Sequence, residues 1–332
     1  MTPTLIIVMC AGAVGLSWAA TALVRRWAAR AVLDVPNARS LHVIPTPRGG
    51  GLAIALVVLG IQAWLLLAGV VRAPWGWAAW YTCALLAGLG LRDDLRPLSA
   101  RHRFLAQILI CGGWMWILLE PTSLLAGASW GLQTLAMVWL VNLYNFMDGS
   151  DGLAGTQALL TGLVGGGIAL LTGAESIAVL ALLTASASLG FLFWNWHPAR
   201  IFLGDVGSYF LGGQFGVLAT VTLDEGHSAF FWAILLGPFI VDASLTLLRR
   251  MLRGERWYTA HRTHAYQRLV QAGRGHAWVA WAFATLGLAW SLPLAVVSFY
   301  RPGLGWPCLM LAWGMSAGLW WWVIRATEPV PG

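Results

Sequence analysis

Long apolar stretches, separated by short polar breaks, recur from one end of this 332-residue chain to the other. An α-helix needs about 20 such residues to cross roughly 30 Å of hydrocarbon. With 59% hydrophobic and only 10% charged residues, the chain carries more apolar surface than one water-soluble core can bury. We expect eleven membrane spans, at residues 4–24, 48–71, 75–91, 104–119, 127–142, 152–172, 176–195, 206–223, 228–248, 276–298 and 304–325.

These spans predict helices. They lack the alternation of apolar and polar residues that is typical of membrane β-strands, and a helix satisfies its own backbone hydrogen bonds in lipid. The expected fold class is all-α, a polytopic membrane protein with about 11 transmembrane helices. The first span has its basic residues after the apolar run, which indicates a retained helix rather than a cleaved signal peptide. Four cysteines stand singly, without metal-ligand spacing, and are expected to be core residues: Cys10, Cys83, Cys111 and Cys308.

The distribution of arginine predicts the orientation. All 20 basic residues are arginines, and all except Arg72 and Arg301 follow odd-numbered spans. The positive-inside rule then places the N-terminus in the periplasm and the C-terminus in the cytoplasm. Topogenesis and anionic lipid headgroups alone would also produce such a charge pattern. We expect one domain, residues 1–332, with cytoplasmic active-site loops at residues 25–50, 92–103, 142–152, 195–208 and 249–275.

Acidic and amide residues gather in the same loops. Two adjacent carboxylates, Asp93 and Asp94, follow the third span among four arginines, although a solvated acidic turn would look the same. The fifth span ends in four polar residues at intervals of three, a spacing that places them along one side of a helix: Asn142, Asn145, Asp148 and Asp151. Unpaired polar groups are costly in apolar surroundings, so this spacing favours a functional site.

Three further motifs carry candidate ligands. Asp205 stands at the head of the eighth span, where it would either cap the helix or bind a metal. Arg48 and His42 lie in a loop rich in proline and glycine after the first span. A clamp for sugar and phosphate is suggested by three residues that stand among aromatic side chains: His261, Arg262 and His264.

All of these motifs follow odd-numbered spans, so we expect them to meet at one cytoplasmic site. Carboxylates and amides beside many arginines suit an anionic substrate held through a hard divalent cation, Mg²⁺ with Mn²⁺ as an alternative. The phosphate-binding glycine loops of soluble nucleotide-binding folds do not occur, and no nucleic-acid partner is expected. The sequence therefore favours diphosphate chemistry in a membrane-embedded site.

These residues and their order resemble the polyprenyl-phosphate N-acetylhexosamine-1-phosphate transferase family over roughly residues 34–268. That family includes the enzymes that start O-antigen and enterobacterial-antigen chains, and the phospho-MurNAc-pentapeptide translocase. The resemblance implies a UDP-N-acetylhexosamine donor, an undecaprenyl phosphate acceptor in the bacterial inner membrane, and magnesium as cofactor. It also implies UMP and a lipid diphosphate sugar as products, used for lipopolysaccharide O-antigen or another surface polysaccharide, and it is compatible with a homodimer.

The resemblance also implies roles for single residues. Asp205, in the motif Phe-Leu-Gly-Asp-Val-Gly-Ser, is similar to a catalytic residue and principal magnesium ligand, with Asn145 as the second ligand. Asp93 and Asp94 resemble the family's catalytic aspartate pair. For them we favour positioning and charge control over proton removal, because a lipid phosphate is already largely dianionic at neutral pH. The other residues resemble those that bind the nucleotide sugar and its phosphates: Asp148, Asp151, Asn142, His261, Arg262, His264, Arg48 and His42.

One departure narrows the choice of sugar. The family's histidine-rich loop often has adjacent histidines, whereas Thr263 separates Arg262 from His264 here. The pattern resembles the subgroup that begins O-antigen or capsule repeats with N-acetylglucosamine, N-acetylfucosamine or N-acetylquinovosamine. Phospho-MurNAc-pentapeptide transfer is the alternative.

Two hypotheses from other classes compete with the transferase. A secondary transporter of an anionic solute should have charges near the bilayer midplane and two related halves. No internal repeat is visible, and apart from Asp242 the acidic residues of the site cluster at one interface. A subunit that only binds the lipid carrier would have no need for a set of carboxylates and an amide at that interface.

Overall fold

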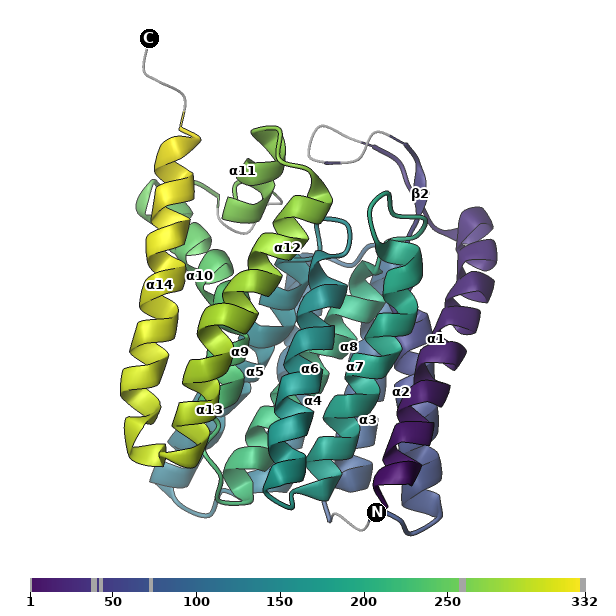
Figure 1. Ribbon diagram of the computed structural model, residues 1–332, viewed down its shortest axis with the longest axis vertical. Helices are drawn as coiled ribbons and strands as arrows, with labels where there is room; N and C mark the ends of the chain where they lie inside the picture. The colour runs from purple at the N-terminus through teal and green to yellow at the C-terminus, as the bar shows by residue number, and fades with distance from the viewer. Residues whose placement is uncertain (1, 37–40, 42–43, 72–73, 257–260, 329–332) are drawn as a thin grey trace.

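The computed structural model describes residues 2–36, 41, 44–71, 74–256 and 261–328, and most of this part of the chain is helical. The longer helices lie side by side and form a bundle (Figure 1). Helix α12 continues through a π-helical turn, Gly287–Ser291, into α13. The α-helices are α1 (Pro3–Ala31), α2 (Gly51–Leu67), α3 (Gly76–Leu95), α4 (Ala100–Leu119), α5 (Leu124–Phe146), α6 (Leu153–Leu171), α7 (Glu175–Asn195), α8 (Gly204–Asp224), α9 (Phe230–Leu235), α10 (Gly237–Leu252), α11 (Ala265–Gln271), α12 (His276–Leu286), α13 (Leu292–Tyr300) and α14 (Gly305–Ala326).

Eight helical segments in the described residues are long and apolar enough to cross a membrane, in agreement with the expected all-α polytopic class. The other three expected spans are shorter or interrupted. Helix α2 has 17 residues, α3 ends in a charged turn, and the stretch 228–248 is divided between α9 and α10. Pro238 has no N–H to continue the hydrogen bonds of α9, so the helix breaks there. The total of eleven spans stays a prediction.

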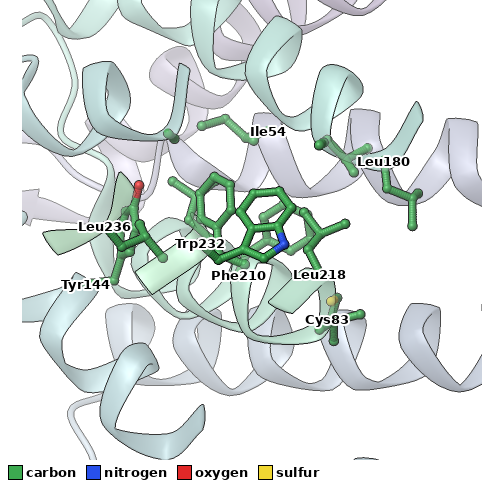
Figure 2. Close-up of a cluster of buried hydrophobic side chains, with 14 of the residues drawn as sticks. Ile54, Cys83, Tyr144, Leu180, Phe210, Leu218, Trp232 and Leu236 are labelled. Carbon is green, nitrogen blue, oxygen red and sulfur yellow. The ribbon is translucent and has the colours of Figure 1, made fainter. Parts of the chain in front are cut away.

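The centre of the bundle is formed by α6, α7 and α8, which are mostly buried, whereas only a minority of the residues of α1, α4 and α5 are buried. Helix α7 packs against α6 and α1, and α8 packs against α3 and α5. Figure 2 shows side chains of several helices meeting in the interior, among them Ile54, Tyr144, Phe210 and Trp232. Cysteines 83, 111 and 308 are buried and unpaired, as expected for core residues, and Cys10 is half-buried.

A short two-stranded sheet lies at one end of the bundle. Strands β1 (Leu33–Asp34) and β2 (Thr46–Pro47) pair antiparallel in the connection between α1 and α2. The next residue, Arg48, forms a parallel bridge with Phe202 in the connection between α7 and α8. Two connections that are far apart in the sequence are therefore joined at this end. The start of α1 and the end of α14 lie at opposite ends of the bundle, with the end of α14 and β2 at the same end (Figure 1).

Candidate active site

The carboxylate of Asp94 joins three segments of the chain. It lies in the last turn of α3, where the apolar stretch alone predicted a loop. One oxygen accepts from the Asp205 N–H at 3.0 Å and from Arg48 Nε at 2.8 Å, and the other accepts from the Val206 N–H at 2.9 Å. The first N–H groups of a helix have no partner within it and carry partial positive charge. The fully buried carboxylate therefore holds the start of α8 and Arg48 in place.

Asp93 has a separate set of partners. One oxygen accepts from the Leu98 N–H at 2.6 Å, and the other accepts from Arg103 Nη1 at 3.0 Å and from the Tyr209 hydroxyl at 3.2 Å. Successive residues of a helix point about 100° apart, which turns the two neighbouring aspartates to different sides of α3. Each aspartate of the predicted pair thus has its own arginine.

Asp205 and Asn145, the predicted metal ligands, are in direct contact. Asn145 Nδ2 donates to Asp205 Oδ1 at 2.7 Å and to Ser208 Oγ at 3.1 Å. Arg48 Nη2 lies 3.8 Å from Asp205 Oδ2. The ends of α5 and α8 and the segment after β2 therefore meet at one point, beside Asp94 of α3.

Two glycines permit this approach. A Cβ on Gly90 of α3 would lie 2.3 Å from the backbone oxygen of Asp205, far inside van der Waals contact. Gly204 has a φ of +77°, in the left-handed region that favours glycine, and a Cβ there would lie 2.8 Å from Asp94 Oδ2. Because Gly204 has no side chain, the next residue, Asp205, can place its carboxylate at the start of α8.

Asp148 is the second carboxyl group near Asp205. Burial, together with the carboxylates of Asp205 and Asp94, raises the pKa of Asp148 well above its ordinary value. The backbone N–H of Gly204 and the guanidinium of Arg48 act in the opposite direction. A bound cation would favour the charged form of this group in the same way as Arg48 does.

The other two residues of the predicted stripe lie elsewhere. Asn142 is inside α5 but faces α4, and Asp151 follows the helix, which ends at Phe146. The expectation of one helical face for all four residues is therefore wrong. Asn142 Nδ2 donates to Gln107 Oε1 of α4 at 2.6 Å and to the Val138 carbonyl. Asp151 instead binds the α7–α8 connection: its Oδ2 is 2.7 Å from His197 Nδ1 and accepts from the Ala199 N–H at 3.1 Å.

The predicted histidine clamp adjoins the end of α5. His264 is buried, and its ring stacks on that of Phe146, the neighbour of Asn145, at 6.1 Å. The His261 ring lies 4.8 Å from the His264 ring, and Arg262 is exposed. Burial, His264 and Arg250 lower the pKa of His261 to about 3. His42, the remaining predicted phosphate ligand, lies outside the described residues.

Asp242 positions this clamp. Its carboxylate accepts from the Ala265 N–H at 2.9 Å and the Tyr266 N–H at 3.1 Å, which are the first N–H groups of α11. The Tyr266 hydroxyl donates to the Phe146 carbonyl at 2.9 Å. The sequence shows Asp242 as a lone carboxylate in an apolar helix, and only the folded chain shows that it caps α11.

Sequence reasoning gave no role to Tyr209 or Arg103, the side-chain partners of Asp93. A signal was present for Tyr209, because it lies four residues after Asp205 and therefore on the same face of α8. Arg103 is one of several arginines after α3, and nothing in the sequence distinguishes it from its neighbours.

The donor set suits a magnesium ion. Asp205 and Asp148 offer carboxylate oxygens, and Asn145 offers its amide oxygen, since its nitrogen already donates to two partners. Among the described residues, no three His, Cys, Asp or Glu side chains converge into a closed metal cage. Magnesium usually binds through one or two carboxylates and completes its six ligands with water and substrate phosphates. An open set of two or three oxygens fits that pattern.

The fold and this site together define an integral membrane protein with a buried acidic centre, edged by arginine, at one end of its helical bundle. Comparison with known proteins agrees with this class. Residues 76–223, which include α3, α5 and α8, match the model of glycosyl transferase family 4.

Relatives match over most of the chain. A probable undecaprenyl-phosphate N-acetylglucosaminyl 1-phosphate transferase of Bacillus subtilis is 30% identical over 83% of this chain and 80% of its own. A decaprenyl-phosphate N-acetylglucosaminephosphotransferase of Mycobacterium tuberculosis is 33% identical over 79% and 74%. A phospho-N-acetylmuramoyl-pentapeptide-transferase of Synechococcus is 32% identical over 85% of each chain. The chain belongs to glycosyl transferase family 4, and it is a transferase rather than a transporter.

Proposed function

We propose that this protein transfers N-acetylhexosamine 1-phosphate from a UDP-sugar to undecaprenyl phosphate in the bacterial inner membrane. UMP and undecaprenyl diphosphate sugar are the products, and the active site faces the cytoplasm. N-acetylglucosamine, or a 6-deoxy relative such as N-acetylfucosamine or N-acetylquinovosamine, is the transferred sugar. The product begins O-antigen or another surface polysaccharide.

The observation that carries this proposal is the cluster of Asp205, Asn145 and Arg48, held by Asp94 where α3, α5 and α8 meet. Carboxylate and amide oxygens beside a guanidinium can bind a diphosphate through a divalent cation and through direct charge contacts. The names of the relatives support a polyprenyl phosphate as the acceptor and an N-acetylhexosamine 1-phosphate as the transferred group. The arginine distribution supports the proposed orientation.

In the proposed reaction, an oxygen of the lipid phosphate attacks the phosphorus that carries the sugar. A new phosphorus–oxygen bond forms, the bond between that phosphorus and UMP breaks, and UMP leaves with the bonding electron pair. The lipid phosphate is largely dianionic at neutral pH, so no residue has to remove a proton from it. Magnesium, when bound, would neutralise charge on the diphosphate oxygens.

The residues of the chain then act mainly by position and charge. Arg48 offers a guanidinium to the phosphate oxygens, and Asp205 and Asn145 would hold the cation beside them. Asp94 fixes the orientation of Asp205 and Arg48 and makes no contact with substrate. Asp93 does the same for Arg103 and Tyr209. Alignment of three reacting groups and neutralisation of their charge are what phosphoryl transfer requires.

Release of UMP by the purified protein tests the proposal. With UDP-N-acetylglucosamine, undecaprenyl phosphate and Mg²⁺, we expect UMP, and we expect Asp205→Asn to reduce its rate at least about a hundredfold. Asp224→Asn is the matched control, because Asp224 is exposed at the opposite end of the same helix. Equal rates and equal magnesium demand in wild type and Asp205→Asn would show that the ligand assignment is wrong.

A donor panel identifies the sugar. It contains UDP-N-acetylglucosamine, the UDP forms of N-acetylfucosamine and N-acetylquinovosamine, and UDP-MurNAc-pentapeptide. We expect turnover of one of the first three, because Thr263 interrupts the histidine run of the pentapeptide enzymes. Turnover of the pentapeptide donor alone would replace this assignment with the activity named for the Synechococcus relative.

A further inference from the structure

A second cluster of arginines lies where α1 approaches β2 and the α7–α8 connection. It surrounds a cavity of about 840 Å³. None of the residues assigned above to the metal or the nucleotide sugar lines this cavity. Its lining comes from three separate segments, and the residues that matter here are Arg25, Arg26, Arg30, Arg200, Trp27 and Pro47.

Trp194 holds two of these arginines in place. The Arg25 guanidinium lies 5.0 Å from its ring centre and the Arg200 guanidinium 5.8 Å, both within the range of cation–π attraction. The indole N–H donates to the Trp18 carbonyl at 3.0 Å, and the Arg200 N–H donates to the Trp194 carbonyl at 2.8 Å. The two guanidinium groups are therefore positioned before any ligand arrives.

The positive charge of the cavity is not neutralised by the described part of the chain. No carboxylate among the described residues forms an ion pair with Arg25, Arg26, Arg30 or Arg200, and none lines the cavity. Arg25 Nε is buried and has no hydrogen-bond partner among the described residues. A buried donor without a partner is costly, so a bound anion would stabilise this arrangement.

The surroundings of the cavity indicate a lipid rather than a soluble anion. Leu23 and Trp27 of α1 line it and are exposed, and Trp18 is exposed earlier on the same helix. The arginines follow the apolar part of α1, at the level where a membrane ends and its headgroups begin. A lipid whose phosphate lies among the arginines would therefore have its acyl chains beside the apolar face of α1.

We propose that this cavity binds the phosphodiester headgroup of an anionic glycerophospholipid from the adjoining leaflet. The ligand is a resident lipid and not the acceptor substrate, because the cavity lacks the carboxylates and the amide that the transfer reaction needs. Pro47 lines the cavity, and the next residue, Arg48, contacts Asp94 and Asp205. A lipid bound here would brace the segment that carries Arg48.

Lipid binding to the whole purified protein, measured by native mass spectrometry during lipid titration, tests this site. The probes are phosphatidylglycerol, phosphatidylcholine and undecaprenyl phosphate, with inorganic phosphate as a competitor. We expect phosphatidylglycerol to bind more tightly than phosphatidylcholine and, in the variant Arg26→Gln/Arg30→Gln, an affinity for phosphatidylglycerol lower by on the order of tenfold, with the affinity for undecaprenyl phosphate unchanged. Arg26 and Arg30 are exposed, so the variant should fold like wild type.

Arg101→Gln/Arg274→Gln is the matched control, since it also removes two exposed arginines that follow odd-numbered predicted spans but lies outside the cavity. It should keep the wild-type affinity for phosphatidylglycerol. Equal losses in the two double variants would refute the site and leave only general charge attraction. Binding of phosphatidylcholine or inorganic phosphate as tight as that of phosphatidylglycerol would also refute it. Weaker binding of undecaprenyl phosphate in Arg26→Gln/Arg30→Gln, but not in the control, would make the cavity a substrate site and overturn the assignment.

Discussion

Replacement of Asp94 by asparagine tests whether this carboxylate organises the site. Asp94 accepts from two backbone N–H groups of α8 and from Arg48, with all three distances between 2.8 and 3.0 Å. The asparagine NH₂ group would face at least one of these donors, and a buried donor left unpaired costs about 1–3 kcal/mol. Arg48 would also lose a close counter-charge, worth about 1 kcal/mol because its side chain is 30% exposed. We expect Asp94→Asn to be less stable by about 3 kcal/mol.

Thermal unfolding in detergent, followed by tryptophan fluorescence, measures this loss, and UMP release measures its effect on catalysis. Asp94→Asn should lower Tm by about 5 °C or more and should lower the rate. Asp205→Asn should lower the rate while Tm stays the same or rises, because it removes one of several close carboxylates and no backbone contact. A wild-type Tm for Asp94→Asn would refute the positioning role of Asp94.

Three further predictions concern other parts of the site. Gly90→Ala should lower UMP release at least about tenfold, because the new Cβ would press on the backbone of Asp205. Gly88→Ala, whose Cβ meets nothing within 4 Å, should leave the rate unchanged, and equal rates for both variants would contradict this close approach. His261 has a pKa of about 3 and is therefore neutral at higher pH. His261→Gln should have the same acid limb of the pH–rate profile as wild type, and a shifted acid limb would show that His261 titrates. Asp242→Asn should raise KM for the UDP-sugar more than it changes kcat, since it loosens α11 and the histidine clamp; an unchanged KM would argue against that clamp.

The sequence predicted the membrane class and the gathering of polar groups at one end. The length of an apolar stretch can be read from the sequence directly, which predicts the membrane class. Successive loops alternate between the two sides of the membrane, which predicts the polar groups that share one end. The same reasoning placed Asp94, Asn145 and Asp205 together, and the structure brings them together. It also identified Asp205 as the first acidic residue of α8.

The partners of each group could not be predicted in this way. Asn142 and Asn145 are both amides on α5, yet Asn142 faces Gln107 of α4 and Asn145 faces Asp205 of α8. Three residues on a helix turn a side chain by about 300°, which is enough to move it from one neighbouring helix to another. Which helix lies on which side of α5 is a property of the packed bundle.

The end of α5 was the second point that the sequence did not reveal. The spacing from Asn142 to Asp151 is regular, but the helix ends at Phe146, and Asp151 turns to His197 in another connection. The regular spacing alone made Asp151 look like part of one helical face. A glycine and a serine follow Asp148 and permit the turn, and this signal would have favoured a loop.

The central claim is that Asp205 holds a divalent cation together with the diphosphate of the donor. Electron paramagnetic resonance of Mn²⁺, titrated into the purified protein with UDP-N-acetylglucosamine present, measures that binding without any turnover. We predict that Asp205→Asn weakens Mn²⁺ binding by at least about tenfold, whereas Asp224→Asn binds it as wild type does. Wild-type affinity for Mn²⁺ in Asp205→Asn would contradict the account.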